Sequence, residues 1–90
     1  MMDYNVGDIV ISKAGRDKGS FLVVIGFLDD DKLLLADGRL RKTENPKKKK
    51  IKHITKINAK STLICDKIKC NEKIPNALIR KEIERIKEEI

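Results

Sequence analysis

Short apolar runs separated by polar turns fill the first half of the chain. Residues 21–28 are apolar at both phases of a two-residue period, which is typical of a strand buried on both faces, and Gly26 among them predicts a bulge. The β-branched and apolar residues of 6–13 and 32–36 predict two more strands. Residues 14–20 hold two glycines among polar residues and predict a turn between the first two strands.

Further strand and turn signals follow the third predicted strand. An Asp-Gly hairpin signal at 37–38 leads into a short strand at 39–41. Residues 42–50 contain a proline and four consecutive lysines, and we expect them to form an exposed basic loop. Residues 51–57 could add another strand. Short strands joined by tight turns predict a mainly β domain over 1–58, a small antiparallel barrel or meander.

The pattern changes after this domain. Residues 59–75 fit either a short helix or an extended connector, and we assign them as a connector. Asn76 predicts the N-cap of a C-terminal helix over 76–90, whose isoleucines recur at spacings of four, three and four. Such a stripe must be buried against the barrel or against a partner. It consists of Ile79, Ile83, Ile86 and Ile90.

Positive charge is concentrated in one segment of the chain. The 90 residues carry a formal net charge of +7. Residues 39–60 contain ten basic side chains and one acidic side chain, Glu44, whereas the residues before them are net acidic and those after them nearly balanced. This concentration is typical of a surface that binds a polyanion. The length leaves room for one domain with one modest core.

Membrane and export signals are not found in the sequence. The longest apolar stretch, 21–28, is far shorter than the roughly 20 residues that span a bilayer. The N-terminus lacks a basic region followed by an apolar core. We therefore expect a soluble cytoplasmic protein without membrane contact. In that compartment Cys65 and Cys70 should be reduced, ordinary small side chains.

The turn at 14–20 has two interpretations that the sequence does not separate. In the first, backbone N–H groups near the two glycines hold a phosphate together with Lys13, Arg16 and Lys18. In the second, the glycines only shape the hairpin. A nucleotide-binding P-loop is excluded, because AGRDKGS places its lysine before the second glycine and lacks the G-K-[ST] ending.

Three segments together resemble the KOW motif of ribosomal and transcription-elongation proteins. They are GDIV at 7–10, GRDKG at 15–19, and a basic stretch that starts after Asp-Gly and ends in KHI at 52–54. The chain is similar to KOW-type large-subunit ribosomal proteins of the archaeal and eukaryotic type and to their short bacterial relatives. Residues 76–90 of this chain more loosely resemble the C-terminal helix of those bacterial relatives. The resemblance implies an SH3-like barrel that binds RNA, chiefly ribosomal RNA, without catalysis.

Metal and catalytic chemistry are poorly supported. A zinc site usually takes four Cys or His ligands, but the chain has two cysteines and one histidine. Asp29, Asp30 and Asp31 point in different directions as successive residues, and no calcium-loop glycine follows them. His53 has no carboxylate or cysteine nearby in sequence, so we expect it to be a hydrogen-bonded barrel residue or an RNA contact. We predict no enzyme activity, no metal and no cofactor.

The candidate RNA-binding surface combines the basic segment with the glycine turn. Only three aromatic side chains are present, so a platform for stacking single-stranded bases is not expected. The predicted mechanism is electrostatic and shape-based docking of a free monomer onto structured RNA, with ribosomal RNA as the expected class and little base reading. The predicted RNA-binding residues are Lys13, Arg16, Lys18, Arg39, Arg41, Lys42, Lys47, Lys48, Lys49, Lys50, Lys52, His53 and Lys56.

Two alternatives remain open at this point. The lysines could form a solvated loop that contacts nothing. The protein could instead be an interaction module of the translation or transcription machinery, in which the barrel or the isoleucine stripe binds a partner such as a ribosomal protein and RNA contact is secondary. The second alternative depends on whether the stripe is exposed in the folded chain.

Overall fold

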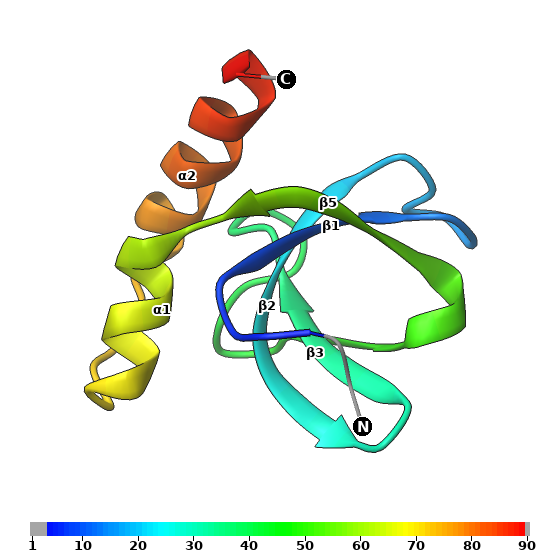
Figure 1. Cartoon of the computed structure of the whole chain (residues 1–90), viewed down its shortest axis with the longest axis horizontal. Helices are drawn as coiled ribbons and strands as arrows, with labels where there is room; N and C mark the ends of the chain where they lie inside the picture. The colour runs from blue at the N-terminus through cyan, green and yellow to red at the C-terminus, as the bar shows by residue number, and fades with distance from the viewer. Residues whose placement is uncertain (1–3, 90) are drawn as a thin grey trace.

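The computed structural model describes residues 4–89, which form one curved antiparallel sheet and two helices (Figure 1). Its five strands are ordered β4-β3-β2-β1-β5 across the sheet. A short 3-10 helix, η1, joins β4 to β5, and both α-helices follow β5. The elements are β1 (Asp8–Ser12), β2 (Phe21–Asp29), β3 (Lys32–Ala36), β4 (Lys47–Lys50), η1 (Ile51–His53), β5 (Ile54–Lys60), α1 (Thr62–Lys69) and α2 (Asn76–Glu89).

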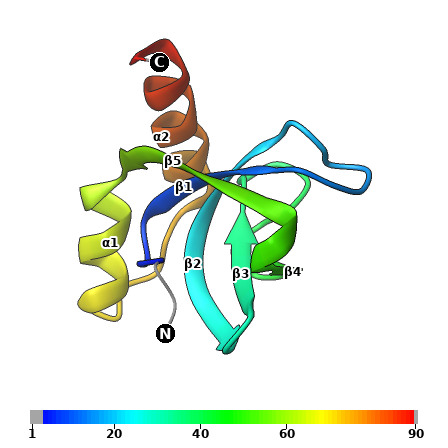
Figure 2. The same ribbon diagram turned by 45° about the vertical axis from the view of Figure 1, so that its right-hand side comes forward.

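The sheet bends at irregular points in its strand pairing. The register of β2 against β3 shifts between Val24 and Gly26, so the bulge predicted at Gly26 is confirmed. A second shift bends β1 against β5 between Asp8 and Val10. Figures 1 and 2 show the resulting curl. The predicted mainly β antiparallel fold with a C-terminal helix is confirmed, while β4 and β5 remain the two edges of an open sheet in the described part of the chain.

Both faces of the sheet are buried, which explains why β2 begins as a continuous apolar run. One face packs against α1 and α2, and the other encloses a second cluster inside the curl. Phe27 and Leu28, near the end of β2, are each 46% exposed, so the predicted two-sided burial applies only to the first part of this strand. The cluster inside the curl consists of Val10, Leu22, Val24, Leu33, Leu35 and Ile54.

The isoleucine stripe of α2 is part of the core. Ile79, Ile83 and Ile86 are buried against the sheet, with Ile9 and Val23 in the same cluster. Ile90 lies outside the described residues. The predicted stripe is therefore confirmed at its three described positions, and its partner is the chain's own sheet. No helix within residues 4–89 is long and apolar enough to cross a membrane.

Helix α1 lies inside the segment assigned as a connector, so the short-helix interpretation is the correct one. The Ser61 hydroxyl caps α1 by accepting a hydrogen bond from Ile64 N at 3.2 Å, and it donates to Glu82 Oε1 of α2 at 2.6 Å. Asn76 is the first residue of α2, but its side chain bonds the loop that precedes β4: Oδ1 accepts from Thr43 N at 2.9 Å. The Asn76 side chain therefore hydrogen-bonds residues 43 and 44 and links α2 to that loop, instead of serving as the predicted N-cap.

Two local expectations were wrong. The four lysines do not lie in a loop: Lys47–Lys50 is strand β4, whose backbone pairs with β3 in a register that sets Lys32 opposite Lys50. Residues 39–41 are not a strand, because Asp37 Oδ1 accepts hydrogen bonds from the backbone N of both Arg39 and Arg41 at 2.9 Å and folds them into a tight turn. The predicted strand at 51–57 begins three residues late, after η1.

Candidate nucleic-acid interface

Strand β4 sorts its four lysines onto two sides. Successive side chains of a strand point to opposite faces, so Lys47 and Lys49 share one side and Lys48 and Lys50 the other. Lys48 and Lys50 are exposed, Lys47 is half-buried, and Lys49 is only 8% exposed. A run of lysines is a common way to protect an edge strand from pairing with other chains, because each ammonium must stay hydrated or paired. In β4 one of them is paired inside the fold.

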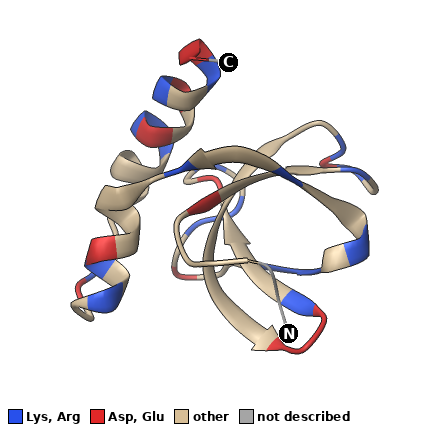
Figure 3. Ribbon diagram, in the orientation of Figure 1, with Lys and Arg blue, Asp and Glu red and all other residues tan. Residues whose placement is uncertain are grey.

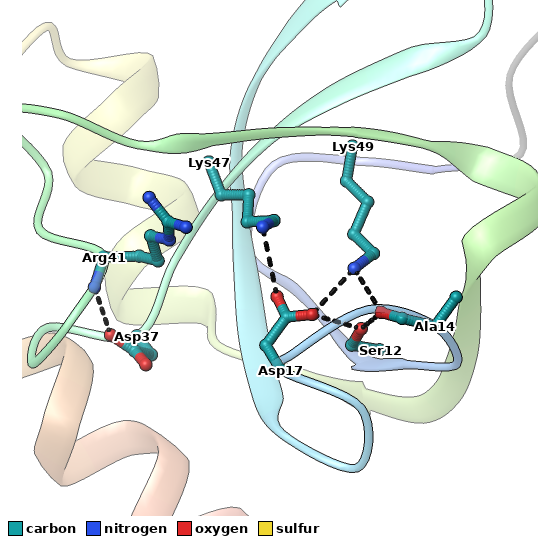
Figure 4. A network of polar contacts seen from close by, with 7 residues as sticks. All are labelled: Ser12, Ala14, Asp17, Asp37, Arg41, Lys47 and Lys49. Carbon is teal, nitrogen blue, oxygen red and sulfur yellow. Dashed lines mark hydrogen bonds and ion pairs between the residues drawn. The ribbon is translucent and has the colours of Figure 1, made fainter.

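The buried partner of Lys49 is the turn between β1 and β2 (Figure 4). Lys49 Nζ donates to Asp17 Oδ1 at 2.8 Å and to the Ala14 carbonyl oxygen at 2.7 Å. Ser12 Oγ lies within hydrogen-bond distance of the same two acceptors, 2.8 Å from Asp17 Oδ1 and 2.9 Å from Ala14 O, which share its single hydroxyl proton. Lys47 Nζ lies 3.9 Å from Asp17 Oδ2, which makes an ion pair without a hydrogen bond. The network fixes the 13–20 turn against β4.

The charge state of Asp17 follows from these contacts. Partial burial favours the neutral acid, but the hydrogen bonds from Lys49 and Ser12 and the charges of Lys49 and Lys47 outweigh it, so the pKa of the Asp17 carboxyl lies below its ordinary value. Asp17 is therefore an anion at neutral pH, and Lys49 is its cation. Lys49 thus differs from the other predicted contact residues, because its ammonium is used to hold the fold together.

An open groove of about 650 Å³ runs along β4 and η1. Exposed Lys48, Lys50 and Lys52 line it together with Lys47 and the half-buried His53. None of the described residues that line the groove is acidic. Figure 3 shows the basic residues along β4 and η1, and the acidic β2–β3 turn adjoins this surface at the start of β3, where Asp31 O accepts a hydrogen bond from Ile51 N at 2.8 Å. We call this surface the lysine groove; its remaining lining residues are Ala14, Gly15, Leu28, Lys32 and Lys49.

Lys32 belongs to the lysine groove but was not among the predicted residues. Its side chain also lies 3.4 Å from Asp29 Oδ2, an exposed pair of the kind that contributes little stability. The signal that would have found it is the strand register: once 47–50 is taken as the hairpin partner of 32–36, Lys32 falls opposite Lys50. Treating 47–50 as a loop removed that signal.

The other predicted residues lie in three further places. Arg16 and Arg41 flank a second depression on the far side of the 14–20 turn, together with Lys47. Arg39 lies beside α2, near Arg80 and Lys87. The remaining residues are exposed and lie outside these depressions, or on the opposite edge of the sheet. They are Lys13, Lys18, Lys42 and Lys56, the last of which pairs with Asp8 Oδ2 at 3.5 Å and lies 5.6 Å from the Tyr4 ring centre.

His53 is positioned by its backbone. Its carbonyl oxygen accepts a hydrogen bond from Lys13 N at 2.8 Å, which ties η1 to the end of β1, and its ring borders the lysine groove. Within residues 4–89, no three His, Cys, Asp or Glu side chains gather as a metal site requires. Cys65 is buried and Cys70 is exposed, and both are free thiols. Neither a known protein family nor a curated protein matches this chain.

Proposed function

We propose that the protein is a non-enzymatic, cytoplasmic RNA-binding protein that docks on structured RNA, with ribosomal RNA as the expected class. The observation that carries this proposal is the lysine groove, in which exposed ammonium groups line one continuous surface without a carboxylate among its described residues. A protein that neutralises phosphates with lysine releases their counterions, and this release supplies most of the affinity. Strand β4 and η1 are consecutive in the chain, so lysines from both contribute to the same groove.

The fold supports the same proposal. An antiparallel five-stranded sheet that curls around an apolar cluster is in keeping with the small SH3-like barrel that the KOW resemblance implies. The GRDKG segment that contributes to the KOW resemblance supplies Asp17, the residue that fixes the turn against β4. The turn is thereby placed at one end of the lysine groove, where Gly15 lines it.

The alternative of a protein-interaction module is weakened in one of its two forms. Ile79, Ile83 and Ile86 are buried against the chain's own sheet, so this part of the stripe is not available to a partner helix. Phe27 and Leu28 are exposed near the end of β2, where its register against β3 shifts, and Leu28 belongs to the lining of the lysine groove. The charged groove therefore remains the surface with the clearest chemistry.

A salt titration of RNA binding tests the proposal. We expect the affinity for an A-form RNA hairpin, measured by fluorescence anisotropy, to fall with salt at a log–log slope near −4, the value for about five neutralised phosphates. An uncharged polymer control should not bind, and an anionic polymer such as heparin should compete with the RNA. Affinity that does not change with salt, or no binding at low salt, would contradict the proposal. Co-sedimentation with large ribosomal subunits in lysate then tests whether the RNA is ribosomal.

A further inference from the structure

A second depression, of about 340 Å³, adjoins the lysine groove. The two share Lys47, and consecutive residues of the same turn line them: Ala14 and Gly15 border the groove, while Arg16 and Asp17 border the second depression. A ligand that follows β4 and passes the turn would therefore reach both. We call the second depression the Leu40 pocket; its other lining residues are Ser20, Leu22, Asp37, Leu40 and Arg41.

The chemistry of the Leu40 pocket differs from that of the groove. Two carboxylates, Asp17 and Asp37, border it, and they oppose the binding of a phosphate. Three basic side chains, Arg16, Arg41 and Lys47, also line it, and an apolar surface comes from the leucines. The mixture of carboxylates, planar guanidinium groups and apolar walls suits a flat group that carries hydrogen-bonding edges better than it suits a bare phosphate. The volume lies at the lower end of the range of about 300–1,000 Å³ that is usual for ligand sites.

Leu40 is held in an unusual position for an apolar side chain. It is 90% exposed, at the tip of a turn whose backbone is hydrogen-bonded at both ends. Asp37 N and Gly38 N donate to the Arg41 carbonyl at 2.9 and 3.1 Å, and Arg80 Nη1 of α2 donates to the Gly38 carbonyl at 2.6 Å. The turn therefore presents Leu40 to solvent from a fixed support. A single exposed leucine is common on protein surfaces, but this one stands between two arginines beside a cationic groove.

The guanidinium groups that line the pocket provide planar surfaces. Figure 4 shows Arg41 extending from its turn toward the side on which Lys47 and Asp17 lie. RNA bases that are splayed out of a helix stack on arginine guanidinium planes as well as on aromatic rings. The scarcity of aromatic residues therefore does not exclude base recognition at this place. Exocyclic amino groups of bases are donors for which carboxylates such as Asp37 are suitable acceptors.

We propose that the Leu40 pocket holds one unpaired RNA base while the phosphates beside it lie in the lysine groove. This inference rests on the proposed function and deepens it: the preferred ligand is a double-stranded RNA interrupted by a bulged nucleotide, and a fully paired duplex is a weaker ligand. The groove supplies salt-dependent affinity that any RNA helix would share. The pocket supplies discrimination between RNAs whose charge differs by only one phosphate.

Two RNA hairpins of the same stem sequence test the inference, one fully paired and one with a single bulged adenine or 2-aminopurine. We expect the wild-type protein to bind the bulged hairpin at least about fivefold more tightly, the lower limit for stacking of one base. Leu40→Ser should abolish this preference and leave the affinity for the paired hairpin unchanged. The matched control is Leu63→Ser, which alters another leucine, 55% exposed on α1, and should keep the preference.

The outcomes separate the two proposals. Equal, salt-dependent binding of both hairpins by the wild-type protein would overturn the base pocket and leave the RNA-binding function intact. No binding of either hairpin would overturn both. A preference that survives Leu40→Ser, or an equal loss for both hairpins, would contradict the placement of the base. Circular dichroism of Leu40→Ser should match that of the wild type, because the Leu40 side chain is 90% exposed and few of its contacts would be lost. Separately, 2-aminopurine fluorescence reports directly on the environment of the bulged base.

Discussion

Replacing Asp17 with alanine should destabilise the protein more than replacing Asp17 and Lys49 together. The single change Asp17→Ala leaves the Lys49 ammonium, which is 8% exposed, with the Ala14 carbonyl as its remaining acceptor in this network. The double change Asp17→Ala/Lys49→Met removes the buried cation as well, and the methionine fills much of the space of the lysine stem. A buried charge without its partner is costly, whereas an apolar replacement of both partners is much better tolerated.

The structure sets the size of the effect. Removing one partner of a buried ion pair costs about 3–5 kcal/mol. Asp17 is 19% exposed and Lys47 is close by, so water and a second cation moderate the loss. We therefore expect Asp17→Ala to lower the free energy of unfolding by about 2–3 kcal/mol, a value within the range for hydrogen bonds to charged groups. The double variant should recover about 1 kcal/mol of that loss.

Urea unfolding at neutral pH measures these differences. The control is Glu89→Ala, which breaks the exposed Arg85–Glu89 pair on α2 and should cost about 0.5 kcal/mol or less. The reasoning would be refuted if Asp17→Ala cost no more than this control, or if the double variant lost the sum of the two single losses. Lys49→Met should also reduce RNA affinity less than Lys48→Met, because the ammonium of Lys49 faces inward.

The Asp17 pair also predicts a pH dependence. Its pKa is lowered in the folded protein, so the folded state binds the proton less readily than the unfolded state does. The stabilisation is therefore fully present above the ordinary aspartate value of 3.8 and is lost as the pH falls through the lowered pKa. The difference in unfolding free energy between the wild type and Asp17→Asn should shrink below that value. A constant difference down to acid pH would contradict the assignment.

Three further predictions concern the fold. Gly38→Ala should cost about 1–3 kcal/mol in urea unfolding, because Gly38 has φ +79° and an added Cβ would lie 2.5 Å from the Asn76 carbonyl oxygen; a neutral result would contradict that contact. Ile86→Ala should lower the free energy of unfolding by about 2–5 kcal/mol and leave the mass in sedimentation equilibrium that of a monomer. Loss of self-association with an unchanged free energy of unfolding would mean instead that the stripe is an interface. Ser61→Ala should cost about 1–2 kcal/mol, since it removes the cap of α1 and a donor to Glu82, and unchanged stability would show that the cap is dispensable.

The parts of the fold that the sequence predicts are those in which local pattern and packing agree. The isoleucine spacing of α2 follows the helical period, and the sheet buries its described members. Gly26 lies in an otherwise continuous apolar run, and the strand register shifts there. In both cases the signal is contained in neighbouring residues, and distant contacts only complete it.

Strand β4 could not be predicted in this way. Four lysines have low strand propensity and resemble a solvated loop. Their strand conformation depends on backbone pairing with β3 and on the bond between Lys49 and Asp17, a residue 32 positions away. Because the strand was missed, two features of the site were missed with it: the groove contribution of Lys32 and the inward direction of Lys49. The Leu40 pocket likewise joins the 14–20 and 37–41 turns through tertiary contacts alone.

The measurement that tests the central claim most directly compares two charge reversals of equal net charge. Lys48→Glu/Lys50→Glu changes two exposed residues of the lysine groove, and Lys73→Glu/Lys81→Glu changes two exposed lysines outside it. Anisotropy titrations with an RNA hairpin should show that the groove variant loses at least about tenfold more affinity and that its log–log salt slope becomes shallower by about 2. An equal loss in both variants would mean that RNA responds only to net charge, and the groove would not be the binding site.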